Sequence, residues 1–169
     1  MSSFAMLESL KRYLAQYTRG RIAVVIGDEL CSESERQLMY RGVCGDIPAE
    51  EAELLTHLYT ALRKLIAPLY PECIVFLCAN DVVQKVFRGS IQLYACSSGK
   101  LELSKHRLDS FLKCLSIADT LLILRLSKPM KPVVDVIPLA IAMGKRVVVI
   151  SKDFRDLDGY SDEYVRIDA

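Results

Sequence analysis

The sequence has little of what marks the common classes of enzyme and binding protein. Its 169 residues include no tryptophan and two histidines, and 22 basic side chains stand against 21 acidic ones, a formal net charge of +1. Because no excess of positive charge attracts nucleic acid, we expect no nucleic-acid partner. The longest apolar runs, 120–124 and 147–150, are far shorter than the ~20 residues that span a bilayer, so we expect no transmembrane helix.

Sequence patterns that mark nucleotide and hydrolase sites are absent as well. The chain has no GxGxxG stretch, no P-loop and no GxSxG stretch. The first pattern binds dinucleotides, the second binds nucleoside triphosphates and the third presents a serine nucleophile. The sequence therefore gives no direct support to these three classes.

The six cysteines do not form a recognisable site. Their spacing is irregular, with no CxxC pair and no histidine arranged as a zinc ligand, so we expect no metal site. Cys73, Cys78 and Cys96 fall inside apolar runs, where a free cysteine behaves as a small buried hydrophobe, and no cleavable signal sequence precedes them. We therefore expect reduced thiols and a cytoplasmic location.

Most of the chain alternates between strand and helix patterns. With 51% hydrophobic residues, it has enough apolar side chains for one core. The predicted strands cover 21–26, 73–79, 91–96, 120–126 and 146–151, with a short edge strand at 164–167. The predicted helices cover 31–40, 49–70, 82–87, 106–117 and 135–143. This order predicts a three-layer Rossmann-like α/β domain over residues 21–169, with a mostly parallel sheet of five or six strands.

Residues 1–20 predict a separate amphipathic helix. Apolar residues from Phe4 to Tyr17 recur at steps of three and four, with charged residues between them. The simplest interpretation is that the apolar face packs on the domain. The alternative is a helix that docks on a protein partner.

Candidate binding residues follow from the expected sheet, because ligands of open parallel sheets bind beyond the carboxyl ends of the strands. The candidates are Gly27, Asp28, Ser32, Ser34, Asn80, Ser127, Lys128 and Lys131. The loop after Gly27 leads to a helix start where NH groups and two hydroxyls suit a phosphate, although neighbouring carboxylates oppose one and plain helix capping explains both serines. Asn80 is also placed to cap the helix 82–87. No residue is predicted as catalytic.

Two segments, 116–127 and 137–151, carry a resemblance to a known family. The stretch "SIADTLLILRLS" and the stretch "IPLAIAMGKRVVVIS" resemble the flavoprotein family related to the phosphopantothenoylcysteine decarboxylases. The resemblance implies a Rossmann-like homo-oligomer that binds flavin mononucleotide (FMN), with Ser127 on the flavin ring and the phosphate in the loop after Gly27. Lys128 to Lys131 replace the family's Asn-Thr pair and the decarboxylase histidine has no clear counterpart, so we do not expect a decarboxylase. Some shortened relatives accompany bacterial microcompartments and begin with an amphipathic helix.

Three functions stay open at this point. The first is an FMN-binding flavoprotein domain or a degenerate, non-catalytic relative of one. The second is a non-enzymatic interaction or scaffold protein, such as a microcompartment accessory, which uses the N-terminal helix. The third is a nucleoside- or nucleotide-processing enzyme, which needs a carboxylate nucleophile, for which Asp28, Asp81 and Asp135 are candidates.

Overall fold

The computed structural model describes residues 7–8, 10–14, 20–27, 34, 37–38, 41–45, 47–77, 80–124, 131–151 and 163–166, of which 131–136, 151 and 163–166 by their backbone alone. The strands are β1 Ile22–Ile26, β2 Cys73–Phe76, β3 Ile91–Gln92, β4 Tyr94–Ser97, β5 Lys100–Leu103, β6 Thr120–Leu124, β7 Arg146–Ser151 and β8 Glu163–Arg166. The helices are α3 Ala49–Ile66, a 3-10 turn Ala67–Leu69, α4 Asp81–Val86, α5 Lys105–Ile117 and α6 Lys131–Ala142.

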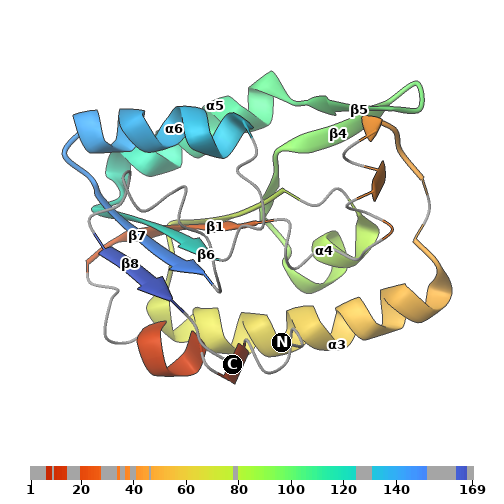
Figure 1. Cartoon of the computed structure of the whole chain (residues 1–169), viewed down its shortest axis with the longest axis horizontal. Coiled ribbons are helices and arrows are strands. Elements are labelled where there is room, and N and C mark those ends of the chain that lie inside the picture. The colour runs from red at the N-terminus through yellow and green to blue at the C-terminus, as the bar shows by residue number, and fades with distance from the viewer. Residues whose placement is uncertain are drawn as a thin grey trace.

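The main sheet has the strand order of a Rossmann fold. Six strands pair in the order β3-β2-β1-β6-β7-β8, and every pair is parallel. Numbered along the sheet strands alone, this is the order 3-2-1-4-5-6, which reverses between β1 and β6. The predicted parallel sheet and α/β class are confirmed (Figure 1).

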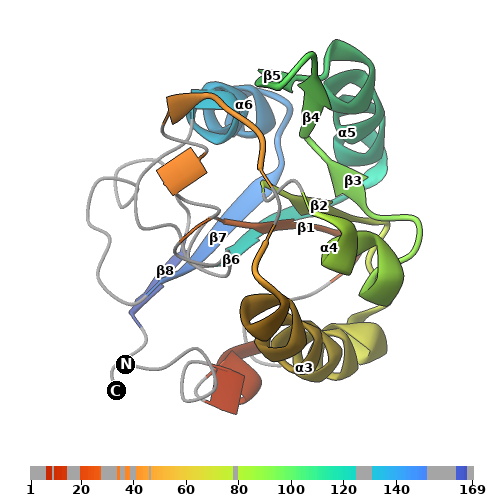
Figure 2. The ribbon, with the colours of Figure 1, turned by 90° about the vertical axis from the view of Figure 1, so that its right-hand side faces the viewer.

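Helices cover both faces of this sheet because its central strands are apolar on both sides. All five residues of β1 and of β6 are buried. Along β1, Val24 and Ile26 join the core on one face, whereas Ala23 and Val25 join the core on the other. Helices α3 and α4 lie on the first face, and α5 and α6 lie on the second (Figures 1 and 2).

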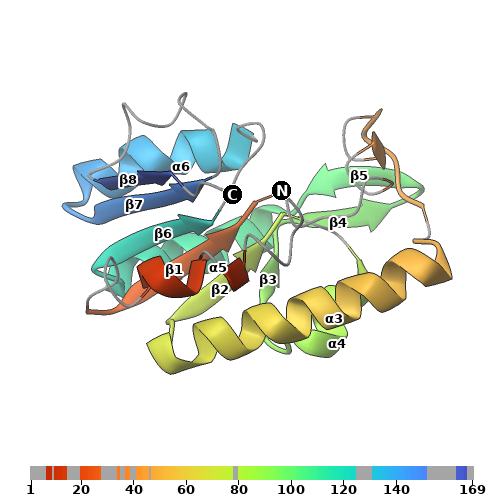
Figure 3. The same cartoon turned by 60° about the horizontal axis from the view of Figure 1, so that its bottom comes forward.

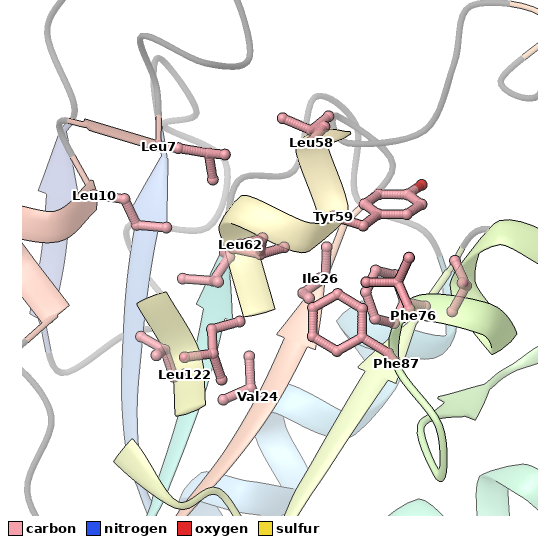
Figure 4. Close-up of a cluster of buried hydrophobic side chains, with 14 of the residues drawn as sticks. Leu7, Leu10, Val24, Ile26, Leu58, Tyr59, Leu62, Phe76, Phe87 and Leu122 are labelled. Carbon is pink, nitrogen blue, oxygen red and sulfur yellow. The ribbon is translucent and has the colours of Figure 1, made fainter. Parts of the chain in front are cut away.

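The N-terminal helical segment belongs to the first of these cores. Leu7, Leu10 and Leu14 are buried there, together with residues of α3 such as Leu62. Figure 4 shows Leu7 and Leu10 beside Leu62 at one end of the cluster, with Phe76 and Phe87 at the other. The apolar face of this segment is therefore used for packing within the chain, which was the simpler of the two interpretations.

The predicted third strand, 91–96, is divided in the structure. Only β3 stays in the parallel sheet; β4 leaves it and pairs with β5 as an antiparallel hairpin that projects past the sheet (Figure 3). The hairpin turns at Ser98 and Gly99, whose φ angles of 52° and 77° are those of a tight two-residue turn. Apart from Gln92, the side chains are apolar from β3 into β4, so the sequence did not reveal the bend between these two strands.

Helix α6 starts four residues earlier than residue 135, at Lys131, and Pro138 lies inside it rather than in its first turn. The predicted start at residue 135 is therefore too late. The predicted end at Gly144 is confirmed by its φ of 75°.

The expectation of reduced thiols is wrong for four cysteines. Cys44 is bonded to Cys96, and Cys73 is bonded to Cys114. The partners are 52 and 41 residues apart in sequence, and only the fold brings them together. No group of metal-binding side chains and no helix long and apolar enough to cross a membrane is found among the residues that the structure describes.

Candidate functional site

The reversal of strand order places the expected binding edge at the carboxyl ends of β1 and β6. Gly27 ends β1 there, is buried, and donates its N–H to the carbonyl of Leu124 at 3.1 Å. Asp28, Ser32, Ser127 and Lys128, all predicted as binding residues, lie outside the described residues. Lys131 is the first residue of α6, and its side chain is not described.

Beside this edge, a cavity opens beyond the carboxyl end of β2. Its volume is about 680 Å³, and nine described residues line it: Cys44, Gly45, Ile47, Ala52, Asn80, Asp81, Val82, Lys85 and Cys96. Asp81 and Lys85 project from α4 one turn apart, so a carboxylate and an ammonium group share one wall. The cavity falls within the usual range for small-molecule sites, roughly 300–1,000 Å³.

Asn80 is the centre of a hydrogen-bond network that forms the floor of this cavity. Its side-chain Oδ1 accepts from the N–H of Val83 at 2.9 Å and so caps α4, as the sequence predicted. Its carbonyl accepts from Nε2 of Gln92 at 2.8 Å, and Oε1 of Gln92 accepts from Nε2 of Gln84 at 2.9 Å. Asn80 and Gln92 are both buried, and their bonds fix the start of α4 against the end of β3.

A second, smaller cavity adjoins the first beyond β3. Its volume is about 240 Å³, and it shares Asn80, Asp81 and Cys96 with the larger one. Gln92, Tyr94, Ala95 and Arg107 complete its lining. Burial raises the pKa of the Tyr94 hydroxyl above its ordinary value of 10.0, so this group is neutral at physiological pH.

Arg107 is anchored to the bend where β3 passes into β4. Its Nη1 donates to the carbonyl of Gln92 at 3.0 Å and to the carbonyl of Tyr94 at 3.3 Å. The backbone N–H of Arg107 donates a separate hydrogen bond to Oγ of Ser104, at 3.3 Å. The guanidinium group is therefore held in a fixed position at the wall of the smaller cavity.

Disulfide Cys44–Cys96 lies in the wall between the two cavities, since Cys96 lines both. It joins the segment 42–44 to the hairpin, where Cys44 N–H also bonds the carbonyl of Gly99 and Leu101 N–H bonds the carbonyl of Gly42, both at 3.0 Å. The hairpin and this segment therefore close one side of the site as a unit.

Ser34, a predicted phosphate ligand, is used differently. Its Oγ donates to Oε1 of Glu51 on α3 at 2.9 Å, and the other oxygen of that carboxylate, Oε2, is buried without a hydrogen-bond partner. Of the three carboxylates predicted as nucleophiles, Asp81 lies in the cavities; Asp28 lies outside the described residues, and for Asp135 only the backbone is described.

Sequence reasoning did not find Gln92, Tyr94 or Arg107. The one available signal was Gln92, a polar residue between Ile91 and Leu93 in an apolar strand, since a buried glutamine needs specific partners. The two histidines are elsewhere: His57 is exposed on α3 and His106 is exposed on α5, and neither lines the two cavities.

Comparison with known proteins finds likeness in structure alone. No protein-family model and no curated protein sequence matches the chain. Among solved structures, it is similar to a sirtuin studied for the structural basis of substrate affinity, with a TM-score of 0.63 and 12% identity over 95% of this chain and 94% of that one. A Sir2 structure with a p53 peptide and NAD+ has a TM-score of 0.59 and 11% identity over 99% and 94%.

A third Sir2 structure holds the inhibitor EX-527, 2'-O-acetyl-ADP-ribose and a deacetylated p53 peptide, with a TM-score of 0.59 and 11% identity over 88% of each chain. At such identities the likeness establishes a shared fold. These neighbours overturn the flavoprotein resemblance, and with it the expected FMN and the microcompartment link, because they are Sir2 proteins solved with NAD+ and with 2'-O-acetyl-ADP-ribose.

The flavoprotein resemblance was misleading for a structural reason. The two segments that carried the resemblance correspond to β6, α6 and β7, a strand-helix-strand unit in the middle of the sheet. Such a unit is built by the same apolar pattern in many Rossmann-like families. It therefore indicates the fold and not the ligand.

Proposed function

We propose that this protein is a nucleotide-processing enzyme that binds NAD or a related ADP-ribosyl nucleotide beyond the carboxyl ends of β1, β2 and β3. The observation that carries the proposal is the polar group Asn80, Asp81 and Gln92, which lines adjoining cavities at this edge of a sheet with Rossmann strand order. Solved structures of the same fold contain NAD+ or 2'-O-acetyl-ADP-ribose, which supports this ligand class.

Asp81 is the carboxylate to which we assign the work on the ribose. In Rossmann sites, an acidic residue commonly binds ribose hydroxyls. When the bond between a ribose and its base breaks, positive charge develops on the sugar ring, and a nearby carboxylate stabilises that charge. Asp81 has the right position for both roles, because it is exposed at the start of α4 and lines both cavities.

Release of nicotinamide from NAD by the purified protein, followed by chromatography, tests this function. Replacing Asp81 by asparagine keeps the shape of the side chain and removes its charge. We expect kcat/KM to fall roughly 10²-fold or more. The matched control is Asp109→Asn on α5, which removes one exposed carboxylate that lines neither cavity and leaves the rate unchanged.

Two results would contradict the proposal. One is a wild-type protein that neither binds nor cleaves NAD under conditions in which it is folded. The other is an Asp81→Asn variant that is as active as the wild type, which would remove Asp81 from the site.

The cytoplasmic location stays a prediction and now carries a condition. Two disulfides are unusual in a reducing cytosol, except in the intracellular proteins of hyperthermophiles. If the protein is cytoplasmic, we expect its source to be a hyperthermophile. If the source is any other organism, we expect the protein in an oxidising compartment.

A further inference from the structure

The smaller cavity contains a cation that the proposed nucleotide site does not use. Arg107 forms no ion pair with any carboxylate of the described residues, and both of its side-chain hydrogen bonds use Nη1. A guanidinium group has five donors in a planar fork. With Nη1 anchored to the carbonyls of Gln92 and Tyr94, the edge formed by Nε and Nη2 has no hydrogen-bond partner within the described part of the chain.

This free edge has the geometry that a planar oxyanion prefers. Two parallel N–H groups of arginine bind the two oxygens of a carboxylate or a phosphate together, which gives both strength and orientation. The anchor on Nη1 means that the guanidinium is already ordered before a ligand arrives, so little side-chain entropy is lost on binding. The neutral hydroxyl of Tyr94, whose pKa is raised by burial, lies in the same lining and is a further donor.

The size of the cavity limits what the anion can be part of. A volume of about 240 Å³ is below the roughly 300–1,000 Å³ of whole-ligand sites, so the cavity accepts one group and not a nucleotide. The adjoining cavity of about 680 Å³ has room for the nucleotide itself. Because the two share Asn80, Asp81 and Cys96, an anion at Arg107 lies beside the nucleotide.

Asp81 determines the order of groups along the two cavities. An anion placed against this carboxylate is repelled, so the group that faces Asp81 must be neutral or positive, as a ribose is before and during loss of its base. Asp81 lines the smaller cavity as well, so within that cavity the anion binds away from this carboxylate, at Arg107. Of the two cavities, Lys85 lines only the larger one, so it does not compete with Arg107 for the anion.

We propose that Arg107 binds the carboxylate or phosphate of a second substrate, which it holds beside the nucleotide. This inference rests on the proposed function, since it names a second substrate for the same site. The protein would accordingly prefer co-substrates with an anionic group over neutral ones.

Calorimetric titration of the folded protein with succinate and with inorganic phosphate, each with and without ADP-ribose, tests the proposal and separates the two kinds of anion. We expect at least one of them to bind the wild type, and Arg107→Gln to weaken that binding at least tenfold. Arg107→Lys keeps the charge but loses the fork, and we expect an intermediate loss. The control is Lys105→Gln, an exposed cation two residues away that lines neither cavity, which should change affinity less than twofold.

A second measurement needs no variant, because Arg107 also holds the bend and its loss can unfold the protein. In the NMR spectrum of the wild type, the arginine Nε–H resonance of this residue should shift on adding the anion that binds. Equal effects of Arg107→Gln and Lys105→Gln, or an unmoved resonance at saturating anion, would overturn the proposal. If Arg107 binds the anion while ADP-ribose does not bind at all, the nucleotide function fails and the anion site stands.

Discussion

Asn80 shows how one side chain connects stability to the site. Its side-chain oxygen caps α4, and its carbonyl accepts from the side-chain amide of Gln92, so the start of α4 and the end of β3 meet at this residue. The same residue lines both cavities. Its effect on ligand binding must therefore be separated from its effect on folding.

Two substitutions of Asn80 make that separation. Asn80→Ala removes the cap, and we expect the free energy of unfolding to fall by about 1 kcal/mol. Asn80→Ser keeps a neutral capping oxygen, and we expect a smaller loss than in the alanine variant. Urea unfolding followed by circular dichroism measures both values. Equal stability of the alanine variant and the wild type would show that the cap contributes nothing.

At the scale of elements, the N-terminal helical segment is a part of the core. Leu10 is fully buried in the cluster that it shares with α3, whereas its neighbour Lys11 is exposed. We expect Leu10→Ala to lower the free energy of unfolding by about 2–5 kcal/mol, because it leaves a cavity. Lys11→Ala on the same segment should change it by less than about 0.5 kcal/mol.

Chemical denaturation of the two variants measures these differences. A Leu10→Ala variant as stable as the wild type would favour the alternative interpretation, in which the segment is available to a partner. Loss of stability shared equally by both variants would contradict packing as the cause, and helix propensity cannot explain it because alanine is the best helix former.

The two disulfides should differ in their accessibility to reductants. Cys96 is exposed at the hairpin, whereas Cys114 is 8% exposed and lies on the buried face of α5. Because thiol–disulfide exchange needs access to a sulfur atom, we expect Cys44–Cys96 to open first under a mild dithiol. Alkylation of the new thiols and mass spectrometry of the peptides give the order. The same order of labelling in unfolded protein would show that burial is not the cause.

Strands were predictable from the sequence where a single run of apolar side chains determined them. The runs that became β1, β6 and β7 are apolar except at the strand ends, as expected for strands buried on both faces. The bend after Gln92 was not predictable, because the apolar run continues through it. It depends on Arg107, which binds carbonyls on both sides of the bend and is 15 residues away from Gln92 in sequence.

For the whole molecule, the class of fold followed from the sequence and the ligand did not. Alternating strands and helices determine a parallel sheet with two helical layers, which the structure confirms. The cavity walls instead combine α4, the hairpin and the segment 42–44, which long-range contacts and a disulfide bring together. The absence of a GxGxxG pattern also directed the sequence interpretation away from dinucleotides.

We propose above all that the site binds an ADP-ribosyl nucleotide and not a flavin. Calorimetric titration of the wild-type protein with ADP-ribose, and separately with FMN, tests it most directly. We expect one ADP-ribose to bind per chain, weakened by Asp81→Asn, and no binding of FMN. A saturating ligand at 100 times its Kd should also stabilise the fold by about 2.7 kcal/mol. Binding of FMN with no binding of ADP-ribose would contradict the claim.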